Sequence, residues 1–114
     1  MSIHTFKTTL QDRDISVRMG WDRPLQGFFM CVLYTDIPED DYNADEWLYT
    51  NLNEPPQKAF TASMVPWVEK LTELGITLPN SIVAMVESDK TEDRGNHFVE
   101  HWLDDEGNHQ HKVL

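Results

Sequence analysis

Basic residues, cysteine and long apolar runs are all scarce in this chain of 114 residues. Nine Lys and Arg face 20 Asp and Glu, which gives a formal net charge of −11. A chain with this charge repels DNA, RNA and anionic membranes, so we expect no direct binding to nucleic acid and no membrane association. The longest apolar run, residues 28–34, is also too short to span a bilayer.

Several functional signatures are missing as well. The single cysteine, Cys31, excludes an internal disulfide and favours a reducing compartment. The first ten residues lack the basic start and apolar stretch of a signal peptide, so we expect a cytoplasmic protein. The chain contains no nucleophile-elbow motif, no phosphate-binding glycine loop and no dinucleotide motif. These absences favour a protein that is not an enzyme and needs no cofactor.

The length and the aromatic content predict one folded domain. A chain of 114 residues is long enough to bury one hydrophobic core. Four Trp, five Phe and three Tyr supply large side chains for that core. We therefore expect a single domain over residues 1–114.

Alternating and apolar segments predict four strands in the first half of the chain. Residues 3–10 are rich in β-branched side chains, and residues 15–19 place Ile15, Val17 and Met19 on one face. These two segments predict a hairpin. The apolar residues 28–34 predict a central strand buried on both faces, and residues 47–52 predict a neighbouring strand.

Two helices and a hairpin are expected in the second half. Apolar side chains at helical spacing predict a helix from Ser63 or Met64 to Gly75, with Ser63 as a cap. Asn80 or Ser81 is expected to cap a second helix, and residues 97–114 predict a C-terminal hairpin. The sequence thus predicts an α+β fold: a mostly antiparallel sheet of about five or six strands with two helices on one face.

Acidic residues are concentrated between residues 36 and 46, where six carboxylates occur without any Lys or Arg. Such a segment attracts basic partners and speeds their encounter, although acidic residues also serve plain solubility. Rows of carboxylates also resemble the phosphates of nucleic acid, so one hypothesis is a mimic that blocks a nucleic-acid-binding protein. The predicted partner-binding residues in this segment are Glu39, Asp40, Asp41, Asp45 and Glu46.

The loop at residues 20–27 offers a second contact hypothesis. Trp21 and Arg23 belong to residue types that dominate binding hot spots, and Pro24 stiffens the loop. In the alternative interpretation, Trp21 packs against the core and Asp22 pairs with Arg23. Aromatic side chains are usually largely buried, which favours this alternative.

Four of the five histidines lie close together near the C-terminus: His97, His101, His109 and His111. Side chains two residues apart share a face of a strand, so each predicted strand presents a pair. A hairpin loop with an odd number of residues places His101 opposite His111, whereas a two-residue loop places it opposite Lys112. The first register gives an alternative function, a zinc or similar divalent metal site or a small metalloenzyme.

The leading hypothesis is a small acidic interaction protein, regulatory or inhibitory, that presents carboxylates to a basic partner. The alternatives are the histidine metal site and a structural subunit of a larger assembly. In size and acidity the chain resembles small inhibitors made by phages and mobile elements, such as anti-CRISPR proteins. That resemblance is one of composition, and no residue is carried over from it.

Overall fold

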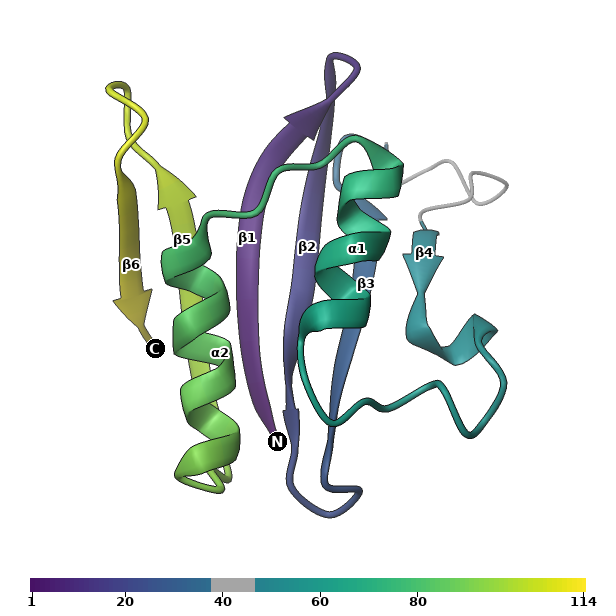
Figure 1. Cartoon of the computed structure of the whole chain (residues 1–114). Helices are drawn as coiled ribbons and strands as arrows, with labels where there is room; N and C mark the ends of the chain where they lie inside the picture. Colours follow the sequence, from purple (N-terminus) through teal and green to yellow (C-terminus); the bar gives the residue numbers. More distant parts are fainter. Residues whose placement is uncertain (38–46) are drawn as a thin grey trace.

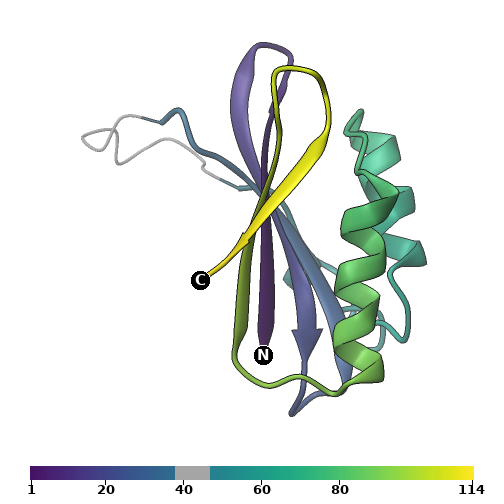
Figure 2. The same cartoon turned by 90° about the vertical axis from the view of Figure 1, so that its left-hand side faces the viewer.

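The computed structural model describes residues 1–37 and 47–114. Six strands form one mixed sheet in the order β4-β3-β2-β1-β5-β6, and two helices, α1 and α2, lie in front of it (Figure 1). Seen along the sheet, both helices occupy the same side (Figure 2), which confirms the predicted α+β fold. The element bounds are β1 Ser2–Leu10, β2 Arg13–Asp22, β3 Gly27–Tyr34, β4 Trp47–Thr50, α1 Val65–Leu74, α2 Asn80–Thr91, β5 His97–Leu103 and β6 His109–Val113.

The core lies between the sheet and the helices. Val17 on β2 and Met30 on β3 are fully buried on the helix-facing side, and they meet Leu71 from α1 and Ile82 from α2. Within the described residues, the other face of the sheet carries no helix, and Phe29 and Cys31 on β3 are only half-buried there, although Leu33 is buried. The expectation that residues 28–34 are buried on both faces was therefore wrong.

Several predicted boundaries shift. Strand β2 continues through Asp22, because Gly20, Trp21 and Asp22 still pair with β3, and this shortens the predicted loop. The strand predicted at 47–52 ends at Thr50 and continues as a 3-10 helix, Asn51–Asn53, in which the Thr50 side chain accepts a hydrogen bond from the Leu52 N–H.

The helices begin and end close to the predicted positions, but their caps differ. Helix α1 begins at Val65 after Met64, which makes no side-chain cap, and Pro66 lies in the first turn where it displaces no hydrogen bond. Gly75 ends α1 with a left-handed φ of 85°, which favours glycine. Helix α2 follows Pro79, so neither Asn80 nor Ser81 is its cap.

The parallel pairing of β1 with β5 was not predicted. It joins the first strand of the chain to the C-terminal hairpin, with His4 opposite Val99 and Phe6 opposite His101. Because β5 then pairs antiparallel with β6, the hairpin continues the sheet at the edge opposite β4. The first and last segments of the sequence therefore lie next to each other, beneath α2.

No helix in the described part of the chain is long and apolar enough to cross a membrane.

Candidate functional site: a histidine relay beneath helix α2

All five histidines gather at one end of the sheet, on the side that faces α2. The hairpin adopts the odd-loop register, so His101 on β5 lies opposite His111 on β6. His4 on β1 stacks on His101 with the ring centroids 5.0 Å apart, and His109 lies 5.0 Å from His101 on the other side. His97 lies at the edge of this group, 6.0 Å from His4.

Three of these rings form a continuous hydrogen-bonded chain between a carboxylate and a hydroxyl. His4 Nε2 lies 2.7 Å from Asp89 Oδ2, and His4 Nδ1 lies 2.7 Å from His101 Nε2. His101 Nδ1 then lies 2.8 Å from His109 Nε2, and His109 Nδ1 lies 2.7 Å from Ser81 Oγ. We call this chain of Asp89, His4, His101, His109 and Ser81 the histidine relay.

The local folding explains how the relay is positioned. His4 alternates with Ser2 and Phe6 on the inner face of β1, and all three side chains are buried. Asp89 lies in the last turns of α2, where the helix faces β1, and Ser81 lies in the first turn. Helix α2 therefore runs along the relay, and two of its residues, Asp89 and Ser81, form the two ends of the relay.

Only one arrangement of hydrogens satisfies the relay when its imidazoles are neutral. The Asp89 carboxylate only accepts, so His4 Nε2 must carry a hydrogen and His4 Nδ1 must accept one. The same reasoning makes His101 Nε2 a donor and its Nδ1 an acceptor from His109 Nε2. His109 Nδ1 then accepts from the Ser81 hydroxyl. Every bond of the relay therefore points from Ser81 toward Asp89.

Burial keeps the middle of the relay uncharged. The pKa of His101 is lowered to about 3, mainly by burial and in smaller part by the neighbouring histidines His4, His109 and His111. Burial and the adjacent His111 also lower the pKa of His109. A proton that enters the relay is therefore unstable on its central ring.

The carboxylate at the inner end is held as an anion. Burial by itself favours the neutral form of Asp89, but hydrogen bonds from His4 and Ser2 reverse this and leave its pKa below the ordinary value. Arg94 adds a cation, with its Nε 3.1 Å from Asp89 Oδ1. Asp89 is only 1% exposed, so this compensation is needed for the charge to remain buried.

A small pocket of about 250 Å³ opens at this inner end and is lined by His4, Asp89, Arg94 and His97, among others. The outer end is different, because Ser81 is exposed and His109 is half-buried. The relay therefore connects a pocket beneath α2 to the outer surface at the start of the same helix.

The metal-site prediction is only partly matched by this geometry. His101, His109 and His111 lie together as expected, whereas His97 lies on the far side of His4. Nitrogens that would serve as ligands are instead hydrogen-bonded to one another. Across residues 1–37 and 47–114, no group of three or more His, Cys, Asp or Glu is arranged to hold a metal ion.

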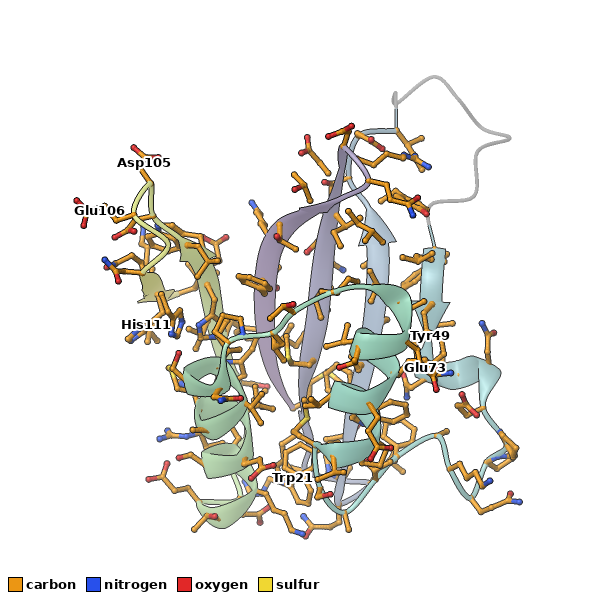
Figure 3. The ribbon with its side chains drawn as sticks, turned by 45° about the horizontal axis from the view of Figure 1, so that its top comes forward. Trp21, Tyr49, Glu73, Asp105, Glu106 and His111 are labelled. Carbon is orange, nitrogen blue, oxygen red and sulfur yellow. The ribbon has the colours of Figure 1, made fainter. Side chains whose placement is uncertain are left out.

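The acidic partner-binding prediction lies mostly outside the described residues, because Glu39, Asp40, Asp41, Asp45 and Glu46 all fall within 38–46. At the start of this segment, Asp36 forms a two-point ion pair with Arg13, at 3.0 and 3.2 Å, and Arg13 lowers the pKa of Asp36. A second acidic group is exposed at the tip of the β5–β6 hairpin, where Asp105 and Glu106 are labelled in Figure 3.

The structure buries Trp21, as the alternative interpretation expected, and leaves Arg23 exposed. Trp21 is 2% exposed and packs against Phe28, so it presents no surface to a partner. Its indole N–H donates to Asp93, which also pairs with Arg23 at 3.3 Å. Asp93 replaces the expected partner of Arg23, Asp22, which instead accepts from the Leu25 N–H.

Sequence reasoning missed three members of the relay: His4, Ser81 and Asp89. His4 is 97 residues from His101, so no local spacing connects them. One signal was present in the sequence: His4 occupies an inward-facing position of its strand, between Ser2 and Phe6. A histidine at a core position of a strand needs polar partners, which the rest of the fold must supply.

Comparisons with protein-family models, with curated proteins and with solved structures found no match.

Proposed function

We propose that this protein is a small acidic interaction protein, regulatory or inhibitory, that presents carboxylates to a basic protein partner. The observation that carries the proposal is the distribution of charge, because residues 38–46 contain five carboxylates and no Lys or Arg. Opposite charges speed the encounter between proteins and select partners of the right charge. A partner that normally binds nucleic acid offers the kind of basic groove that such a segment fits.

Asp36, which precedes residues 38–46, pairs with Arg13, so the proposed contact does not include it. With Trp21 buried, the proposal no longer includes an apolar anchor there. We therefore expect an electrostatic interaction whose affinity falls steeply as the salt concentration rises.

Charge reversal tests this proposal directly. The variant Asp40→Lys/Asp41→Lys/Asp45→Lys is used as bait in a lysate of the source organism, beside the unchanged protein, with washes at low and high salt. We expect the unchanged protein to retain a basic protein that high salt releases. The variant is expected to lose it already at low salt.

A second triple variant controls for net charge. Glu87→Lys/Asp105→Lys/Glu106→Lys changes the charge equally, at exposed positions on α2 and at the hairpin tip. It should retain the partner if the segment at residues 38–46 is the contact. Equal loss in both variants would show a response to overall charge, and retention of the partner by the first variant would contradict the proposal.

A further inference from the structure

We propose that Ser81 is a nucleophile toward acyl groups, with His109 as its general base and with His101, His4 and Asp89 as positioning residues. This inference does not rest on the interaction proposed above. The relay lies beneath α2 at the β5–β6 edge of the sheet, whereas the acidic residues 38–46 lie in the sequence between β3 and β4, the two strands of the opposite edge. If the inference holds, the expectation that the chain is not an enzyme is wrong.

The hydrogen bonds of the relay all run from Ser81 toward Asp89. The buried anion of Asp89 orders the three imidazoles so that His109 Nδ1 is an acceptor that faces Ser81 Oγ at 2.7 Å. This is the distance and the donor direction that a general base requires to take a proton from a hydroxyl. The Ser81 lone pairs are then free to attack, because its hydrogen is already directed at the base.

Ser81 is also accessible. Its side chain is exposed at the start of α2, while the groups that orient its base are buried. The lowered pKa of His109 keeps this ring neutral, and so able to accept a proton, at neutral pH. The relay thus combines an exposed hydroxyl with a general base, His109, whose tautomer is fixed by its hydrogen bond to His101.

A negative charge develops on the carbonyl oxygen when the Ser81 hydroxyl attacks. Backbone N–H groups in the first turn of a helix have no carbonyl partner within the helix. Those of Asn80 and Ser81 lie at the same end of α2 as the hydroxyl. Such N–H groups stabilise the oxyanion that forms when a hydroxyl attacks a carbonyl, which is why we choose an acyl ester as the substrate class.

The ester is cleaved in two steps through an acyl-serine. Ser81 Oγ forms a bond to the ester carbonyl carbon while its proton passes to His109 Nδ1. The ester C–O bond then breaks, and the alcohol leaves with the proton from His109. Water hydrolyses the acyl-serine with His109 again as base.

Acetylation by p-nitrophenyl acetate tests the inference in the full-length protein without a His-tag. We expect release of p-nitrophenolate with one acetyl group on Ser81, located by peptide mass spectrometry. Ser81→Ala should abolish this labelling, and His109→Gln should slow it by about 100-fold, the scale of general-base assistance. Acetyl groups spread over lysines, with none on Ser81, would overturn the proposal.

The chain supplies a matched control in Ser63. This serine is also exposed and lies just before a helix, but its Oγ accepts from the Val65 N–H instead of donating to an imidazole. Ser63→Ala should leave the acetylation of Ser81 unchanged. If Ser63 and Ser81 are acetylated at equal rates, the relay does not activate Ser81 and the inference fails.

Asp89→Asn tests the positioning role separately from folding. The amide can donate as well as accept, so it no longer fixes the tautomer of His4, while its shape is preserved. We expect an altered pH profile of Ser81 acetylation in a variant that remains folded by circular dichroism. An unchanged profile in the folded variant would show that Asp89 does not position the base.

Discussion

Asp89 is the residue on which the stability of the relay depends most. It is buried and anionic, and it is compensated by His4 and Arg94. Asp89→Ala leaves the buried N–H of His4 without an acceptor, and an unsatisfied buried donor typically costs about 1–3 kcal/mol. We therefore expect Asp89→Ala to lower the free energy of unfolding by about 2 kcal/mol in urea denaturation. Glu87→Ala, at an exposed position of the same helix, should change it by less than about 0.5 kcal/mol.

His101 predicts how stability depends on pH. Its pKa is about 3 in the folded protein and about 6.5 in the unfolded chain, so the unfolded chain binds more protons between these values. The contribution of His101 is therefore complete above about pH 6.5 and is lost as the pH falls toward 3. The lowered pKa of Asp89 acts in the same direction at the acidic end of this range. Charged and titratable groups face His101 from β1, α2 and β6, namely His4, Asp89, His109 and His111.

The measurement is the midpoint of urea denaturation at pH 7.5, 6 and 5. We expect the midpoint of the unchanged protein to decrease as the pH is lowered from 7.5 to 5. The decrease should be smaller in His101→Gln, which has no imidazole to titrate at this position. His111→Gln removes an exposed imidazole outside the relay and should reduce the slope much less than His101→Gln, because burial is the main cause of the lowered pKa of His101. An equal slope in the His101 and His111 variants would show that the buried ring is not the source.

At the scale of elements, the pairing of β1 with β2 depends on a close approach at Gly20. A Cβ placed on Gly20 would lie 2.0 Å from the backbone carbonyl oxygen of Ser2, which is closer than any real contact. Gly20→Ala must therefore displace the start of β1, which also carries His4. We expect a loss of about 2 kcal/mol or more in the free energy of unfolding.

Gly95→Ala is the matched control for this prediction. A Cβ at Gly95 would meet only the end of the Arg23 side chain at 3.6 Å, an ordinary contact. We expect its urea midpoint to stay close to that of the unchanged protein. A Gly20 variant as stable as the Gly95 variant would show that the two strands separate without cost.

The elements also show which local patterns were informative. The alternation of Ile15, Val17 and Met19 predicted the inward face of β2, and Gly75 predicted the end of α1. The parallel pairing of β1 with β5 has no local signature, because it depends on which edge of the sheet the hairpin joins. This pairing brings His4 to His101, so the missed contact and the missed site have the same cause.

At the scale of the whole molecule, the local patterns were sufficient for the fold class but not for the site. The length and the aromatic content predicted one small domain, and the order of the predicted strands and helices predicted its α+β class. The four C-terminal histidines were recognised as a group, but their partners come from residues 4, 81 and 89. A site assembled from distant segments depends on tertiary packing, and the spacing of its residues in the sequence carries no information about it.

The position of β1 within the sheet has a consequence for synthesis on the ribosome. This strand leaves the ribosome well before β5, one of its two neighbours, which begins only at His97. Until β5 is synthesised, the side of β1 that pairs with β5 has no partner, and such non-local pairing is slow to form. The sheet is therefore completed only after residues 97–103 have emerged. A stalled product that ends before His97 would expose an unpaired strand edge, which is a site for aggregation.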